Sequence, residues 1–476
     1  MSASQWLPVA DIAAKVNTGH LKAADLVEQA LKTIEAKKEY QAIIATTEVR
    51  ARERAASIDA AIKNGQKSGR LAGVPFIAKD NFLVLGAQTT AASNMLRGFE
   101  APYQATVIDR LEAEGAICVA KANMDAFAHG SSTENSDYFV TKNPHDKERV
   151  PGGSSGGSAA AVVLDMVPFA LGTDTGGSIR QPASFVGCIG YKPTYGLMSR
   201  SGVVAMASST DTIGTLTRTT NDAALVIDVM AGQDPLDGTT IKREETSYAN
   251  LPEGIAGKKV GLIKEWMDEG LDEGVRKVIL EAVSTLKAAG ASVEEISLPS
   301  LSLSLAAYYI IAPAEISSNL SRHDGQRYQH AADQPADLDE SYMKSRGQGF
   351  GKEAKRRIMI GTYVLSSGYY DAYYTKAQTV RTKLINEFNQ AFTNFDFLIG
   401  PVVPTAAFKI GENANDPLQM YLGDIMSVGA SLVGIPSVSV PAGTTDSMPV
   451  GLQIMAAQRQ DRALLGAAKA AEELLQ

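Results

Sequence analysis

Short apolar runs recur along the chain from about residue 70, and each ends in a glycine-rich or polar turn. They occupy residues 74–78, 117–120, 167–171, 260–263, 293–298, 397–403, 437–440 and 451–455. Helical patterns lie between several of them; the clearest places Val275, Ile279 and Leu286 on one face and stops at Gly290. This alternation predicts an α/β fold, with a large mixed β-sheet covered by helices on both faces.

The remaining segments are expected to surround that sheet. Leu26, Ala30 and Ile34 share one helical face, so residues 1–65 are predicted to form an N-terminal helical cover. Residues 66–476 are predicted to form one compact α/β domain, because no repeat or low-complexity linker divides them. A stretch around 300–390, rich in Tyr, Ser and Arg, is expected to be a helical insertion in that domain.

Charge and composition exclude several classes of protein. The net charge is −8 and no strongly basic block occurs, so unaided binding to nucleic acid through its phosphates is not expected. No basic stretch followed by an apolar one opens the chain, and the longest apolar stretch, 159–171, is too short for a bilayer. We therefore expect a cytoplasmic protein without membrane association. Cys118 and Cys188 each lie in an apolar run and are expected to be buried, reduced thiols.

Two loops crowded with glycine and serine flank the apolar stretch at 159–171. They are residues 151–158, PGGSSGGS, and 172–180, GTDTGGSIR. A phosphate-binding P-loop would need lysine and then serine or threonine after its second glycine, whereas Ser158 and Ala159 stand there. Glycines that only permit tight corners are the second alternative, but they do not explain the serines. Acyl transfer through a serine nucleophile is the interpretation that we favour.

A serine nucleophile needs a base, and histidine is the commonest one. The five histidines, His20, His129, His145, His323 and His330, are not near a Gly-x-Ser-x-Gly motif. Lys79 is the alternative, because it ends the apolar run 74–78 and a buried lysine can be neutral near pH 7. A lysine at the end of a strand is more commonly a solvated charge.

Lys79 and the two glycine–serine runs together resemble the amidase signature family in residue types, order and spacing. The resemblance implies that Ser178 is the nucleophile, that Ser154 relays its proton and that Lys79 is the terminal base. It also implies a cis peptide bond before Ser154 and a supporting role for Ser155. The oxyanion hole would be formed by the backbone N–H groups of Thr175, Gly176, Gly177 and Ser178.

Longer segments are similar to one branch of that family, the A subunits of glutamyl-tRNA(Gln)/aspartyl-tRNA(Asn) amidotransferases. They are residues 181–185, 192–196, 207–211, 317–322, 349–357 and 366–374. The branch implies that glutamine is hydrolysed and that its ammonia passes to a partner, which amidates Glu-tRNA(Gln) or Asp-tRNA(Asn). It implies a heterotrimer with the B and C subunits as partners, through which tRNA is mainly contacted. No cofactor or metal is expected in this chain, and ATP and Mg are expected on a partner subunit.

Substrate-binding residues also follow from the resemblance. A free amino acid presents a carboxylate and an ammonium, so its pocket needs one fixed cation and one fixed anion. Arg357 and Asp424 stand where the family has those charges, and Tyr308 and Ser131 stand at further contacts. A structural ion pair is the alternative for Arg357 and Asp424.

The chain departs from the branch at a few positions. Ala126 stands where the family usually has an acid, His129 where it has methionine and Val186 where it has cysteine. His129 precedes a Gly-Ser-Ser turn that is expected to border the active site, where it would tune the pH response or simply be packed. These changes affect the pocket wall and leave the three catalytic positions intact.

Two other functions remain as alternatives to the glutaminase subunit. A free-standing amidase for another small amide would keep the Ser–Ser–Lys triad without the partners. A catalytically silent scaffold would only assemble a complex, but it would have no reason to retain Lys79, Ser154 and Ser178 together.

Overall fold

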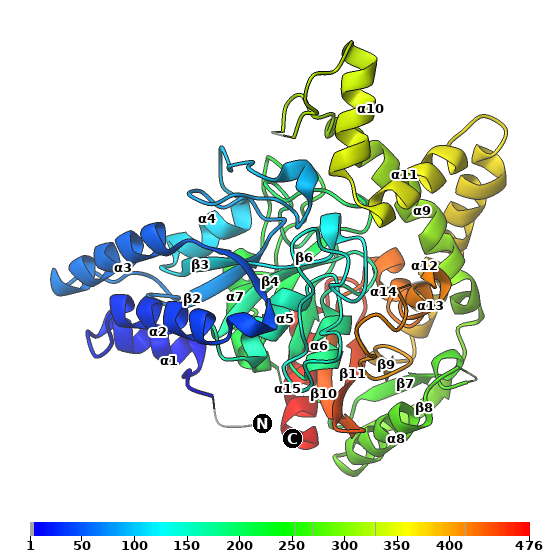
Figure 1. Cartoon of the computed structure of the whole chain (residues 1–476). Coiled ribbons are helices and arrows are strands. Elements are labelled where there is room, and N and C mark those ends of the chain that lie inside the picture. The colour runs from blue at the N-terminus through cyan, green and yellow to red at the C-terminus, as the bar shows by residue number, and fades with distance from the viewer. Residues whose placement is uncertain (1–3, 253, 269, 329, 415) are drawn as a thin grey trace.

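An 11-stranded mixed sheet runs through the computed structural model, with the strand order β1-β3-β2-β4-β6-β5-β10-β11-β9-β7-β8 (Figure 1). The structure describes residues 4–252, 254–268, 270–328, 330–414 and 416–476. The strands are β1 (Ile43–Thr46), β2 (Pro75–Lys79), β3 (Ile117–Ala122), β4 (Phe169–Asp174), β5 (Ile189–Lys192), β6 (Thr212–Thr217), β7 (Lys259–Ile263), β8 (Ser292–Ile296), β9 (Phe397–Pro401), β10 (Ser437–Thr445) and β11 (Met448–Met455). β2 is parallel to β3 and β4, whereas β4 and β6 are antiparallel, so the predicted mixed sheet is confirmed.

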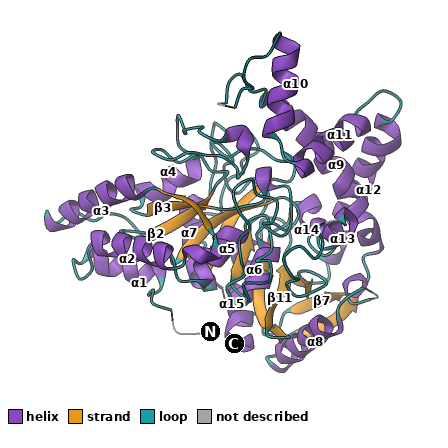
Figure 2. Cartoon of the chain, in the orientation of Figure 1, coloured by secondary structure: helices purple, strands orange, loops and turns teal. Residues whose placement is uncertain are grey.

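Helices cover the sheet on both faces, as predicted (Figure 2). They are α1 (Val9–Asn17), α2 (Ala23–Ala36), α3 (Glu48–Lys63), α4 (Thr106–Ala113), α5 (Gly156–Val163), α6 (Arg180–Val186), α7 (Thr220–Met230), α8 (Glu273–Ala288), α9 (Ser304–Asn319), α10 (Leu338–Gly349), α11 (Lys352–Val364), α12 (Lys376–Ala391), α13 (Pro417–Leu422), α14 (Val428–Val433) and α15 (Asp461–Leu475). α5 and α6 pack against each other and the sheet, and α7 and α8 both pack against α15 in a second group. The central strands are therefore buried along their whole length, as in β2 and β4.

Helices α9, α11 and α12 pack together beside the sheet, and α10 projects from them at the top of Figure 1. Close approach of α9 and α11 depends on Gly361, because a Cβ there would lie 2.5 Å from the carbonyl carbon of Pro313. These two helices carry Tyr308 and Arg357, so the contact at Gly361 sets the distance between two predicted site residues.

Several smaller expectations have clear outcomes. The helix predicted before Gly290 is α8, and both cysteines are free and buried. Strand β1 was not predicted; it lies within the segment expected to be helical and pairs with β3 at the edge of the sheet. Throughout the described ranges, no helix is long and apolar enough to cross a membrane.

Candidate active site

Lys79 ends β2 with its ammonium nitrogen in the interior, and the side chain is fully buried. Its Nζ donates to the hydroxyl oxygens of Ser154, at 2.7 Å, and of Ser155 and Thr173, both at 2.9 Å. No carboxylate oxygen of a described residue accepts a hydrogen bond from Nζ. Burial therefore lowers the pKa of Lys79 to about 7, although the more distant charges of Asp125 and Asp174 raise it in part.

Ser154 lies in the first glycine–serine loop, just before α5, and is fully buried. The peptide bond between Gly153 and Ser154 is cis, as predicted. Asp125 borders this loop: its backbone N–H donates to Ser154 O at 3.3 Å, and its carboxylate accepts from Thr133 N–H at 2.9 Å. Burial raises the pKa of Asp125 to about 6. The sequence analysis assigned Asp125 no role.

Ser178 lies in the second loop, between β4 and α6, and 9% of its surface is exposed. Ser155 N–H donates to Ser178 O at 3.1 Å, so the two loops are bonded to each other. The Ser178 hydroxyl makes no hydrogen bond with any described residue. The catalytic hydroxyl predicted from the sequence thus lies next to the network around Lys79 and stays available to a ligand.

A buried ion pair between Asp174 and Arg180 fixes the second loop, with 2.8 Å between Asp174 Oδ1 and Arg180 Nη2. Burial raises the pKa of Asp174, but the charge and hydrogen bonds of Arg180 lower it more, to about 2. Gly177 N–H donates to Asp174 Oδ1 at 2.9 Å. Of the four predicted oxyanion donors, Gly177 is therefore occupied in this structure, whereas Thr175, Gly176 and Ser178 donate no backbone hydrogen bond to a described residue.

Arg357 lies on α11 with 3% of its surface exposed. Its guanidinium carbon lies 5.3 Å from the ring centre of Tyr309 and 5.5 Å from that of Tyr421. Its Nε donates to Glu353 Oε1 at 2.8 Å, and Tyr421 Oη donates to the same oxygen at 2.8 Å. This arrangement holds the planar cation in one orientation.

Asp424 accepts a hydrogen bond from Tyr309 Oη at 2.7 Å. Burial raises the pKa of Asp424 to about 7, against the lowering effects of that hydrogen bond and of Arg357. Tyr308 is packed against the second loop, since a Cβ on Gly176 would lie 2.6 Å from Tyr308 Cζ. The predicted charged and aromatic positions thus gather beside the second loop, together with Tyr309, which the sequence analysis missed.

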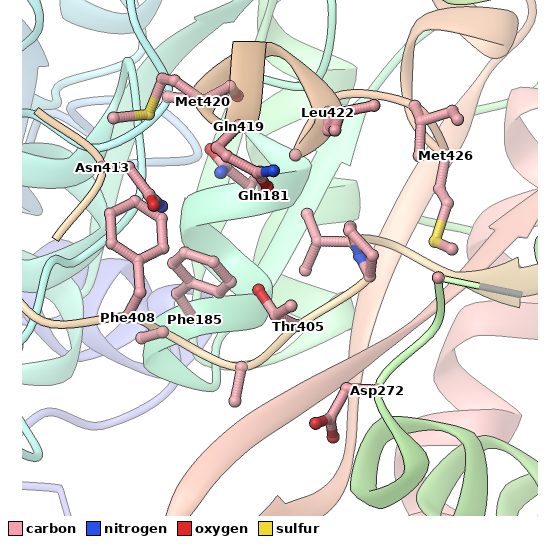
Figure 3. A pocket seen from close by; sticks show the side chains of 18 of the residues that line it. Gln181, Phe185, Asp272, Thr405, Phe408, Asn413, Gln419, Met420, Leu422 and Met426 are labelled. Atoms are coloured by element: carbon pink, nitrogen blue, oxygen red, sulfur yellow. Dashed lines mark hydrogen bonds between the residues drawn. The ribbon is translucent and has the colours of Figure 1, made fainter. Parts of the chain in front are cut away.

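A cavity of about 840 Å³ adjoins these groups (Figure 3). Ser131 and Gln181 line it, and Gln181 Oε1 accepts from Gly153 N–H at 3.1 Å, next to the catalytic loop. Phe185 and Phe408, whose ring centres are 6.1 Å apart, form part of its wall. The predicted residue Ser131 donates to Met420 O at 3.4 Å, which ties one edge of the cavity to α13.

Within the described part of the chain, no group of three His, Cys, Asp or Glu side chains could hold a metal ion. The polar groups that converge near Ser178 are hydroxyls, one lysine, one arginine and carboxylates. Their chemistry is that of proton transfer and binding of charged groups, and it is available from side chains and backbone alone.

Comparison with known proteins agrees with this chemistry. The sequence matches the family described as Amidase over residues 25–465. That range covers most of the chain, and the chain belongs to the amidase family. Within it, the chain is 51% identical over 444 residues to the A subunit of glutamyl-tRNA(Gln) amidotransferase from Thermoanaerobacter pseudethanolicus, covering 93% of this chain and 90% of that protein.

Solved structures give the same picture. The crystal structure of the A subunit of glutamyl-tRNA(Gln) amidotransferase from Thermotoga maritima is 40% identical, with a TM-score of 0.80 over 97% of this chain and 94% of that one. A peptide amidase from Stenotrophomonas maltophilia is 28% identical, with a TM-score of 0.83 over 99% and 97% of the two chains. The fold is thus shared by relatives whose names describe different reactions.

Proposed function

We propose that this chain hydrolyses glutamine as the glutaminase subunit of a tRNA-dependent amidotransferase. Ser178 is the nucleophile, Ser154 relays the proton and Lys79 is the terminal base. The observation that carries the proposal is a buried lysine bonded to Ser154, next to a site that presents Arg357 and Asp424 as opposite charges. Substantial identity to proteins named as this subunit supports it.

The reaction begins at the side-chain amide of glutamine. Ser178 Oγ attacks the amide carbon while its proton passes through Ser154 Oγ to the neutral amine of Lys79. Negative charge on the carbonyl oxygen is stabilised by backbone N–H groups of Thr175, Gly176 and Ser178, and by Gly177 once it shares its donor with Asp174. The proton returns to the amide nitrogen, the C–N bond breaks, and ammonia leaves a glutamyl ester on Ser178. Water then attacks the ester by the same route and releases glutamate.

The other end of glutamine accounts for the charged side chains. Arg357 binds the α-carboxylate and Asp424 binds the α-ammonium, since each ligand group then meets an opposite charge away from bulk water. Tyr309 fixes Asp424 through its hydroxyl. Tyr308 and Ser131 border the path between these charges and Ser178. The arrangement favours a free amino acid over an apolar amide.

The rest of the reaction belongs to the complex. The names of the relatives support assembly with two partners, the B and C subunits, which receive the ammonia and use ATP and Mg to amidate Glu-tRNA(Gln) or Asp-tRNA(Asn). A cytoplasmic location agrees with this role.

The test is ammonia release from glutamine by the purified chain, alone and with its partners, ATP and charged tRNA. We expect release that rises when the partners and their substrates are present and that Ser178→Ala abolishes. Turnover of other small amides without turnover of glutamine would overturn the proposal and favour a free-standing amidase. Failure of Ser178 to react with a sulfonyl fluoride would instead favour a catalytically silent scaffold.

A further inference from the structure

His129 is a buried histidine whose ring has no partner among the described residues. None of its surface is exposed, and neither ring nitrogen makes a hydrogen bond with any of them. Its backbone, in contrast, is held on both sides: the N–H donates to Ala126 O at 3.0 Å, and Asn135 Nδ2 donates to His129 O at 2.7 Å. Leaving a buried polar group unpaired costs free energy, so a group from outside the chain is the expected partner.

The position of His129 indicates which group that is. The residues that follow it pack on the catalytic loop, since a Cβ on Gly153 would lie 2.6 Å from Ser132 N and 2.9 Å from Ser131 C. On the other side, the charge of Arg357 reaches the imidazole: burial lowers the pKa of His129 well below its ordinary value, and Arg357 lowers it further. His129 therefore borders the space between the catalytic loop and the arginine.

Arg357 itself is not saturated. The hydrogen bond that it donates to a described residue comes from Nε, and its two terminal nitrogens donate none within the described part of the chain. An anion bound there would meet a neutral imidazole as well as the guanidinium. A neutral imidazole has one N–H donor and one acceptor, so it adds a hydrogen bond without adding a second positive charge.

We propose that His129 is a further substrate-binding residue, whose neutral imidazole donates an N–H to the α-carboxylate held by Arg357. The inference rests on the proposed glutaminase function and deepens it. His129 would then select for amides that carry a free α-carboxylate. It would act on binding and leave the chemistry at Ser178 unchanged.

His323 provides a matched control. It is also buried, with an unpaired Nδ1 among the described residues, and its ring lies 5.3 Å from Phe127, which is 6.2 Å from the ring of His129. The charges that lower the pKa of His323 are those of Arg322 and Arg346, after the larger effect of burial. His323 therefore shares the aromatic packing of His129 but not the proximity to Arg357.

The experiment compares glutamine with 4-aminobutyramide, which is glutamine without its α-carboxylate. Ammonia release is measured for the full chain, with any subunits that co-purify, as wild type, His129→Met, His129→Gln and His323→Met. We expect His129→Met to raise KM for glutamine about 10–100-fold at nearly unchanged kcat, because a hydrogen bond to a charged group is lost. His129→Gln keeps an N–H donor and should recover part of the affinity. His323→Met should leave KM for glutamine within about twofold, and 4-aminobutyramide should be turned over equally by wild type and His129→Met.

Three results would overturn the inference. An unchanged KM in His129→Met would mean that the imidazole binds only water, and an equal loss with both amides would mean a structural role. No release from glutamine by wild type would overturn the proposed function and the inference with it, which separates that failure from the first two. Labelling of Ser178 by phenylmethanesulfonyl fluoride at the wild-type rate shows that a variant is folded. His129→Leu, which also lacks a donor, replaces His129→Met if methionine does not fit.

Discussion

Two lysines lie one step apart on neighbouring parallel strands, and their surroundings differ. Lys79 of β2 and Lys121 of β3 are both fully buried, and Lys121 is in register with the residue before Lys79. Lys121 Nζ donates to the carboxylate of Asp80 at 2.9 Å, in a buried ion pair. Lys79 Nζ donates to hydroxyls, of which Ser154 is the nearest. Burial without a contacting anion is what makes Lys79 a base near pH 7, whereas Lys121 serves stability.

Replacing the unpaired lysine should have the largest effect. Lys79→Met removes the only group in the triad that can take the proton of Ser178, so kcat/KM for amide hydrolysis should fall about 10⁴-fold or more. The variant should still fold, because no carboxylate is left without its partner. Ammonia release and circular dichroism measured on the same sample check both parts. Activity within tenfold of wild type would mean that Lys79 is not the base.

Replacing the paired lysine should act on stability instead. Lys121→Met leaves the buried carboxylate of Asp80 without a counter-charge, which should cost about 3–5 kcal/mol in the free energy of unfolding. Urea denaturation measures this change, and adding Asp80→Asn should restore part of it. The folded fraction should keep kcat within a few-fold of wild type. Loss of turnover at full stability would contradict the contrast between the two lysines.

A carboxylate placed beside Lys79 should make it resemble Lys121. Ser155 Oγ lies 2.9 Å from Lys79 Nζ, so Ser155→Asp would hold the proton on the lysine. We expect kcat/KM at pH 7 to fall about 10–100-fold, in line with a rise of one to two units in the pKa of the base. Ser155→Asn has the same size without the charge and is the control. An equal loss in both variants would assign the effect to packing.

The pH profile sharpens the comparison with the smallest perturbation. The amine of Lys79 must be neutral to accept a proton, and its pKa lies at about 7. The rate should therefore rise about tenfold per pH unit below that value and level off above it. Initial rates of ammonia release from pH 5 to 9 give the curve, and Ser155→Asp should move it to higher pH. A profile that is flat from pH 5 to 8 would show that no group with this pKa limits the reaction.

The catalytic residues were predictable because they lie in short segments with distinctive composition. Ser154 and Ser178 stand out as serines in glycine runs, and Lys79 as a charge that ends an apolar run. Spacing and residue type therefore reveal these three positions without knowledge of the fold. The structure adds the surrounding hydrogen bonds, such as that from Lys79 to Thr173, which no local pattern indicates.

Two central strands were missed for a physical reason. β6, TIGTLT, is fully buried yet has three threonines and a glycine, so its composition is typical of a surface strand or loop. β5 ends in Lys192, whose Nζ donates to the backbone oxygens of Pro193 and Ile435. Burial of such polar residues depends on partners that are distant in sequence, which periodicity cannot detect.

The substrate-binding residues were harder still. Arg357 and Tyr308 came from a family resemblance, and Tyr309, which bonds Asp424, was not singled out. Their positions depend on how α9 packs on α11 and how residue 421 stacks on Tyr309, with 4.1 Å between the ring centres. Tertiary contacts of this kind leave no local sequence pattern.

The reacting groups and the charged side chains come from separate parts of the chain. Lys79, Ser154 and Ser178 lie at or near the ends of β2 and β4, whereas Arg357 and Asp424 are supplied by much later segments. Evolution can therefore exchange the later segments for others while the earlier ones keep the same bond-breaking machinery. Such modularity explains how relatives named for peptides and for transfer RNA share one architecture. It also marks α9, α11 and the segment around α13 as the place to redesign substrate preference.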